Sequence, residues 1–219
     1  MDDDTRNHAL VRQRVISWYD QKGRDFPWRN SKNPYHILIG EMLLRRTTAT
    51  AVSRIYNEFI NRYDTPERLA SARESTIARS LVSIGLQSTR AKQLRKTASI
   101  IVKNHDGQIP KSLEALQSLP GVGNYIASAV RIFAFGDAIP LVDGNVIHLI
   151  SRVFNMEFSG PSDDKAWDFV ANFGGQHDAR LYWGIIDLVA TTCLRRNPRC
   201  SICPLNDVCK WFVGLTLKQ

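Results

Sequence analysis

Apolar residues recur along most of the chain at spacings of three and four, which is the period of an amphipathic helix. Val11 and Val15 lie on one face of a helix predicted over residues 5–22, and Asn33 before Pro34 begins a second helix that extends to residue 46. No segment alternates apolar and polar residues with the sustained period of two that half-buried strands show. The pattern therefore predicts an all-α protein without an internal repeat.

Capping and stop signals place further helices between loops that carry glycine or proline. Ser88 is the expected N-cap of a basic helix that extends to about residue 104, and Gly85 is the expected end of a short helix before it. The other helices are predicted over residues 52–63, after 65 and after 75, and over 112–118, 125–134, 143–154, 162–173 and 178–193.

A turn with two glycines, Leu119-Pro120-Gly121-Val122-Gly123, separates two of these helices. The glycines let the backbone approach a neighbour closely, and the amide N–H groups at the start of the next helix suit a phosphate. A plain turn that packs on its own protein explains the same residues. Glycines alone favour the plain turn.

Charge adds a preference for a polyanionic partner, because the formal net charge is +8 and the pI is about 9.5. Ribosomal and membrane-surface proteins share this property, so charge by itself does not identify nucleic acid as the partner. No apolar run reaches the ~18 residues of a spanning helix, and Met1-Asp2-Asp3-Asp4 has the wrong charge for a signal peptide. We therefore expect a soluble, intracellular protein that does not bind membranes.

All the cysteines lie near the end of the chain, with the spacing C-x6-C-x2-C-x5-C, at Cys193, Cys200, Cys203 and Cys209. Thiolates so close together can hold a zinc ion or a [4Fe–4S] cluster. A zinc ribbon usually has two C-x2-C pairs, and this chain has one. Basic residues on the same loop could bind phosphates; they are Arg195, Arg196, Arg199 and Lys210.

The glycine turn, the segment Val142-Asp143-Gly144-Asn145-Val146 and the cysteine spacing together resemble the helix-hairpin-helix superfamily of DNA glycosylases, which includes endonuclease III and MutY. The resemblance implies a six-helix barrel over residues 28–136 and an iron–sulfur domain formed by residues 1–27 and 137–219. Double-stranded DNA would bind between them as the target base turns out of the helix. It also implies a [4Fe–4S] cluster on the four cysteines, a monovalent cation at the hairpin, a monomer, and a cytoplasmic location near the nucleoid in a prokaryote.

The resemblance assigns catalytic roles to Asp143, Glu41 and Asn145. Asp143 would stabilise the positively charged sugar that forms as the base leaves, with Asn145 in support, although an Asp at this point is also a good helix N-cap. Glu41 follows Pro34-Tyr35 at the spacing of the MutY catalytic glutamate, and burial would raise its pKa and suit it to donate a proton. A buried structural ion pair is the alternative role for Glu41.

Tyr125 occupies the position at which endonuclease III-like lyases have a lysine that forms a Schiff base with the sugar. A phenol cannot form an imine, so the sequence predicts a monofunctional glycosylase that leaves an abasic site. Packing within its helix is the alternative role for this side chain.

The segment Arg45-Arg46-Thr47-Thr48 resembles the archaeal thymine–DNA mismatch glycosylases, whereas MutY enzymes usually have Gln-Gln-Thr-Gln there. Arg45 would either insert near the orphaned guanine or pair with Glu41 one helical turn before it. Leu86 and Gln87 lie where the family inserts a wedge into the duplex. Backbone groups of Gly121, Val122 and Gly123 would bind DNA phosphate.

We therefore predict a mismatch-specific glycosylase that removes thymine or uracil opposite guanine. The first alternative is an adenine glycosylase of the MutY type, which is weakened because only ten residues follow Cys209, too few for an 8-oxoguanine-reading domain. The second is a DNA-binding iron–sulfur module without catalysis. The presence of both Glu41 and Asp143 argues against that module, because phosphate binding needs neither carboxylate.

Overall fold

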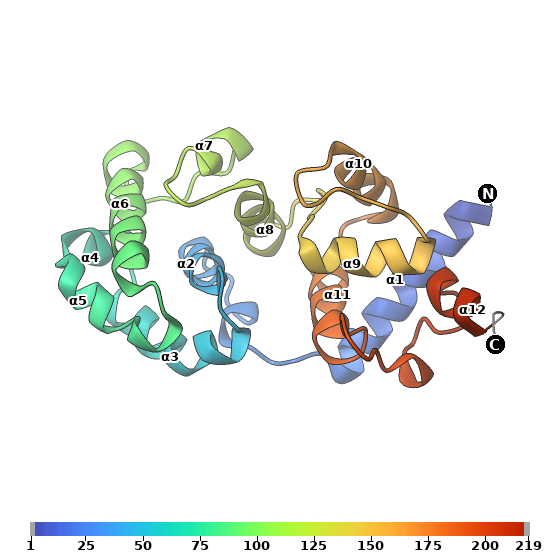
Figure 1. Ribbon diagram of the computed structural model, residues 1–219. Coiled ribbons are helices and arrows are strands. Elements are labelled where there is room, and N and C mark those ends of the chain that lie inside the picture. Colours follow the sequence, from blue (N-terminus) through green and yellow to red (C-terminus); the bar gives the residue numbers. More distant parts are fainter. Residues whose placement is uncertain (1–2, 217–219) are drawn as a thin grey trace. The chain divides into compact units, whose positions relative to one another are not determined.

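The structure is a computed structural model that describes residues 3–216, and all its regular elements are helices (Figure 1). The predicted all-α class is confirmed for this part of the chain. The structure does not describe Met1, Asp2 and residues 217–219. The signal-peptide argument and the ends of the predicted iron–sulfur domain fall on these residues. None of the described helices combines the length and apolar character needed to cross a bilayer.

The chain divides into two compact units. The central unit is Asp25–Asp137, and the terminal unit joins Met1–Arg24 to Ala138–Gln219. The elements of the central unit are η1 (Pro27–Arg29), α2 (Pro34–Leu44), α3 (Ala49–Arg62), α4 (Pro66–Ser71), α5 (Glu74–Arg79), η2 (Val82–Ile84), α6 (Gln87–His105), α7 (Leu113–Gln117) and α8 (Asn124–Phe135).

Helix α2 forms the core of the central unit. It is buried on nearly all sides from Ile37 to Leu43 and packs against α8, α3 and α6. Gly40 allows a close approach of η1, because a Cβ added there would lie 3.0 Å from the Cβ of Trp28. Helix α6 packs along α4 and α5, as Figure 1 shows. These contacts bury α2 as a rigid support for the residues at its C-terminal end.

The predicted cap Asn33 is confirmed and the predicted cap Ser88 is wrong, while Thr65 and Ser112 also cap helices in the structure. The side chains of Asn33, Thr65 and Ser112 accept hydrogen bonds from backbone N–H groups in the first turns of α2, α4 and α7. Ser88 does not cap α6, which begins at Gln87 after Leu86 in the left-handed region with φ 52°. The short helix before Gly85 ends earlier than expected, at Arg79, and the 3-10 turn η2 connects it to Gly85.

The terminal unit is built from α1 (Asp3–Lys22), α9 (Gly144–Phe154), α10 (Asp164–Phe173), α11 (Ala179–Thr191), η3 (Cys200–Ile202) and α12 (Lys210–Thr216). Helix α1 packs along α11, which in turn packs on α9, so the first helix of the chain is bound into the C-terminal half. Asp187 of α11, fully buried, accepts a hydrogen bond from the backbone N–H of Arg24 at 2.7 Å and pairs with the Arg24 guanidinium. This ion pair fixes the end of the α1 segment.

Candidate functional site

The predicted hairpin is present between α7 and α8. Leu119 and Val122 are buried and anchor it, while Gly121 has φ 81°, a left-handed conformation that favours glycine. Gly123 is the N-cap of α8, is exposed, and supplies no side chain to cap the first turn. The first amide N–H groups of α8 are thus left without a capping side chain, as an anion-binding helix start requires.

Arg45 lies against this hairpin. Its Nη1 donates hydrogen bonds to the Gly121 carbonyl at 3.1 Å and to Gln93 Oε1 at 3.4 Å. A Cβ added to Gly121 would lie 3.0 Å from the same nitrogen, so a larger residue there would displace the end of the Arg45 side chain slightly. Arg45 and Tyr125 both border the open hollow around the hairpin. The structure therefore gives Arg45 a partner that neither sequence-based alternative included.

Glu41 is buried in α2, with 4% of its surface exposed. Burial and the negative charge of Glu41 both raise the pKa of the Tyr56 phenol above its ordinary value. The Tyr56 hydroxyl donates to the His36 carbonyl at 3.0 Å, so the phenol is held in place. A carboxyl group in such surroundings is rigidly placed and largely shielded from solvent.

Asp143 caps helix α9, as one of its two expected roles requires. Its Oδ1 accepts from the backbone N–H groups of Asn145 at 2.8 Å and Val146 at 2.7 Å. Its Oδ2 accepts from the Asn145 side-chain amide at 2.8 Å. Asn145 is therefore a direct partner of the carboxylate that it was expected to support.

Burial raises the pKa of the Asp143 carboxyl above its ordinary value, and the hydrogen bonds from Val146 and Asn145 oppose that rise. The positive charge of Arg195 opposes it too. Arg195 is positioned for this because its Nη2 donates to the Gly144 carbonyl at 3.0 Å. The cysteine-bearing loop thus contributes a cation to the surroundings of Asp143.

Leu86 and Gln87 lie at the start of α6. Leu86 is 51% exposed and has φ 52°, an uncommon conformation for a residue with a side chain. Gly85 before it has φ 72° and ψ 171°. The left-handed backbone of Leu86 is the uncommon feature of this turn, and it fits a side chain held out for a partner.

Arg90 was missed in the sequence, although it contacts much of this region. It is 6% exposed, and it donates to the carbonyls of Gly85 at 2.9 Å, Leu43 at 3.1 Å and Met42 at 3.3 Å, and also to that of Arg45. The available signal was its position four residues before Leu94, on the apolar face of α6. A buried arginine on such a face requires a set of acceptors.

The four cysteines line one pocket in the terminal unit, together with Leu149, Leu205 and Phe212. Arg152 of α9 donates to the Leu194 carbonyl at 3.0 Å and lies over the Trp211 ring at 4.4 Å. Within residues 3–216, no three His, Cys, Asp or Glu side chains converge closely enough to hold a metal ion. Four thiols around a mostly apolar pocket fit a [4Fe–4S] cluster better than one tetrahedral zinc ion.

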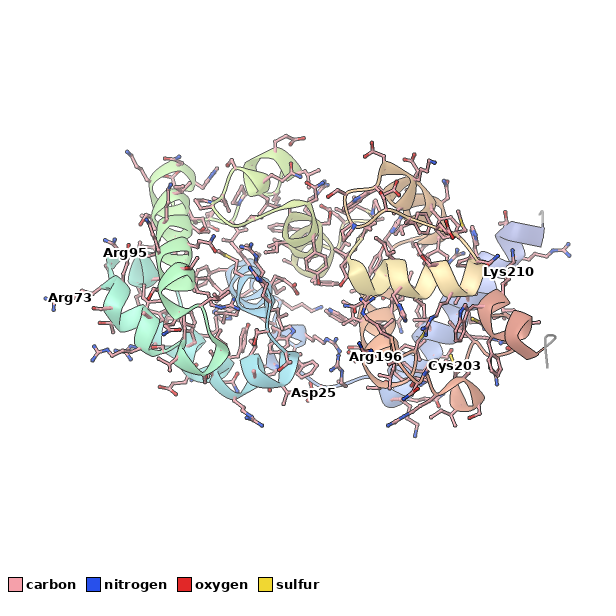
Figure 2. All side chains as sticks on the ribbon, viewed as in Figure 1. Asp25, Arg73, Arg95, Arg196, Cys203 and Lys210 are labelled. Carbon is pink, nitrogen blue, oxygen red and sulfur yellow. The ribbon has the colours of Figure 1, made fainter. Side chains whose placement is uncertain are left out.

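The cluster loop also carries exposed cations. Arg195, Arg196 and Arg199 lie on its surface, and Lys210 follows it at the start of α12; Figure 2 labels Arg196, Cys203 and Lys210. His148 of α9 lies against the loop, with Nε2 2.9 Å from the Cys193 carbonyl oxygen. The loop therefore combines a set of buried and half-buried thiols with a basic outer surface suited to phosphates.

Two parts of the chain match known protein families. Residues 39–166 match the model of the HhH-GPD superfamily of base excision DNA repair proteins. Residues 193–209 match the iron–sulfur binding domain of endonuclease III, so this loop is a [4Fe–4S] cluster site.

The chain is 40% identical to a thymine-DNA glycosylase of Aeropyrum pernix over 92% of this chain and 94% of that one. It is 37% identical to a thymine/uracil-DNA glycosylase of Pyrobaculum aerophilum, over 94% and 93%. An adenine DNA glycosylase of Mycobacterium tuberculosis is 35% identical over 90% of this chain and 66% of its own length. A solved thermostable thymine-DNA glycosylase has a TM-score of 0.92 at 32% identity, covering 97% of this chain and 100% of that one.

Proposed function

Since the chain belongs to the HhH-GPD superfamily of base excision DNA repair proteins, we propose that it is a monofunctional DNA N-glycosylase. Its substrate is thymine or uracil opposite guanine in duplex DNA, and its product is an abasic site in an uncut strand. The observation that carries the proposal is the similarity to the Aeropyrum thymine-DNA glycosylase, over 92% of this chain and 94% of that one.

Base extrusion precedes the chemistry, because the glycosidic bond cannot be reached inside the stack. A mispaired thymine or uracil costs less to extrude than a paired one, which gives the enzyme part of its selectivity. The uncapped start of α8 and the basic cluster loop bind the phosphate backbone. Leu86 enters the space that the base leaves.

Asp143 stabilises the transition state. As the bond to the base breaks, positive charge develops on the sugar, and a nearby carboxylate lowers the energy of that charge. The three hydrogen bonds to Asp143 hold its oxygens in place, so little reorganisation is needed when the charge appears. Asn145 keeps the carboxylate oriented through its side-chain amide.

Glu41 acts on the leaving base or on water. Its buried place in α2 fixes the carboxyl group near Tyr56 and shields it from solvent. With a pyrimidine leaving group, the carboxyl group either polarises O2 of the base or positions the attacking water. Tyr125 lacks the amine that a Schiff base needs, and for this reason the strand stays intact.

Single-turnover assays on labelled duplexes test this function. The duplexes contain T·G, U·G, A·G, A·8-oxoguanine or matched T·A, and each reaction is divided into samples with and without alkali. We expect strand breaks from T·G and U·G only, and only after alkali. Breaks without alkali would refute the monofunctional assignment, and breaks from matched T·A at a similar rate would refute the mismatch rule.

An adenine glycosylase is the second candidate, because the Mycobacterium tuberculosis adenine glycosylase is 35% identical over 90% of this chain. The same panel separates the two. Release from A·G or A·8-oxoguanine alone would support adenine as the target and would mean that Arg45-Arg46-Thr47-Thr48 does not mark a pyrimidine-specific enzyme.

A further inference from the structure

The contacts of Arg90 connect two parts of the central unit that the proposed reaction uses separately. One is the wedge turn, which we define as Gly85, Leu86 and Gln87. The other is the C-terminal end of α2, where Glu41 lies one turn before Arg45. Arg90 is buried between them, with its backbone N–H donating to the Leu86 carbonyl at 2.9 Å.

At the end of α2, the guanidinium replaces hydrogen bonds that the helix itself cannot make. The last carbonyls of a helix lack intrahelical partners and carry partial negative charge. Arg90 Nη1 donates to two of them, Met42 at 3.3 Å and Leu43 at 3.1 Å, and Nη2 donates to the carbonyl of Arg45 just beyond the helix. The side chain thereby fixes the direction in which the chain leaves α2.

At the wedge turn, the same guanidinium holds an unusual backbone. Arg90 Nε donates to the Gly85 carbonyl at 2.9 Å, directly before Leu86 with its φ of 52°. Strained conformations persist only where the surroundings determine them from several sides. One planar group with a fixed fork of donors can satisfy both ends at once, which a lysine ammonium on a flexible stem does less well.

We propose that Arg90 is a positioning residue for base extrusion, which holds the exposed Leu86 at a fixed spacing from the end of α2 that carries Glu41 and Arg45. This inference rests on the proposed glycosylase function for its catalytic consequence. Arg90 acts through Leu86 and α2, because its Nε, Nη1 and Nη2 donate to backbone carbonyls of the wedge turn and of the end of α2.

Arg90→Lys tests the proposal, with Arg95→Lys as the matched control. Arg95 is an arginine of the same helix, labelled in Figure 2, and it also donates to a backbone carbonyl, that of Ala70 at 3.2 Å, and pairs with Glu74. It has no contact with the wedge turn in these hydrogen bonds. We expect Arg90→Lys to slow single-turnover release from T·G about a hundredfold, and Arg95→Lys to change it less than about threefold.

A double-mutant cycle with Leu86→Ala separates positioning from general structure. If Arg90 acts by placing Leu86, the Arg90→Lys substitution should slow release far less in the Leu86→Ala background than in the wild type. An equal factor in both backgrounds would overturn the proposal, because it would mean that Arg90 acts independently of Leu86.

Gly85→Ala provides a second test that leaves the buried arginine in place. A Cβ at Gly85 meets nothing within 4 Å, so its effect comes from the backbone conformation alone, which moves the carbonyl away from Arg90. Gly160→Ala is the control, because Gly160 also has a positive φ, 148°, and nothing within 4 Å of an added Cβ. We expect slower release from Gly85→Ala only, and equal rates for the two variants would contradict the proposal.

Fluorescence of 2-aminopurine beside a stable abasic analogue reads wedge insertion without base release. Wild-type protein should raise the fluorescence on binding, and Arg90→Lys and Leu86→Ala should reduce that rise non-additively. Non-additive signals with no base release from any duplex would refute the proposed function and leave the positioning role standing. Thymine release from T·G with additive signals would refute the positioning role alone.

Discussion

Asp143→Asn distinguishes catalysis from helix capping, because asparagine can keep the cap while losing the charge. The asparagine Oδ1 can still accept from the backbone N–H groups of Asn145 and Val146, which now donate at 2.8 and 2.7 Å. Asn and Asp are about equally good N-caps. The bond that is lost is the one from the Asn145 amide to Oδ2, at 2.8 Å.

The expected stability cost is small. One lost hydrogen bond costs about 1 kcal/mol, and the lost interaction of a charge with the start of α9 costs about 0.3–1 kcal/mol. Removal of a charge from a buried position offsets part of this, because burial raises the pKa of Asp143 and so opposes its ionisation. For a chain of this size, about 1 kcal/mol lowers Tm by about 2–4 °C.

The expected catalytic cost is larger. Loss of a preorganised electrostatic contact to the transition state costs about 3–4 kcal/mol, which slows the reaction by about 10²–10³-fold. The assay is single-turnover release of thymine from a T·G duplex, with Tm and duplex affinity measured on the same preparation. Asp143→Ala serves as the comparison, since it removes the cap as well as the charge.

A near-normal rate in Asp143→Asn, together with a lower Tm in Asp143→Ala, would refute this reasoning. Asp143 would then be a structural cap of α9 without a role in the reaction. A large loss of duplex binding in Asp143→Asn would also contradict the account, because phosphate contacts are assigned to the hairpin and the cluster loop.

Further predictions concern Tyr125, the ionisation of Asp143, Arg195 and the cluster cysteines. Tyr125→Lys places an amine at the start of α8. We therefore expect strand breaks without alkali and a covalent complex with DNA that borohydride traps. An uncut strand without a trapped complex would argue against the assigned position of residue 125. Base release needs ionised Asp143, whose pKa burial raises, so activity should fall with acidification at a higher pH than for an ordinary aspartate. Arg195→Ala removes a positive charge that lowers the pKa of Asp143, so the loss of activity on acidification should move to still higher pH. Arg196→Ala should leave this pH dependence unchanged. An unchanged pH dependence in Arg195→Ala would contradict the electrostatic role of Arg195. Cys203→Ser should lose iron, visible absorption and stability of the terminal unit, and a colourless wild-type protein that contains zinc would refute the cluster.

Local features of the fold were predictable from sequence because they depend on neighbouring residues. Asn33 caps α2 through the residue two places on, and Asp143 caps α9 in the same way. The hairpin turn was recognisable from Pro120 and its glycines. Its confirmed form depends on the positive φ of Gly121, which glycine adopts readily.

Contacts between distant segments were not predictable in this way. Arg45 was expected to pair with Glu41 or to reach DNA, and its observed partner Gly121 lies 76 residues away. Ser88 was expected to cap α6 because serine is a good cap, but the left-handed Leu86 that occupies this position has no sequence signal. Arg90 escaped notice because its acceptors are backbone carbonyls, which every residue possesses.

Identification of the released base by mass spectrometry tests the central claim most directly. Wild-type protein and Asp143→Asn are incubated in parallel with T·G and A·G duplexes, and the free base and the remaining DNA are analysed. We predict free thymine from T·G with wild-type protein only, together with an intact strand that carries an aldehyde abasic site. Free adenine from A·G without thymine from T·G, or equal thymine release by Asp143→Asn, would contradict the account.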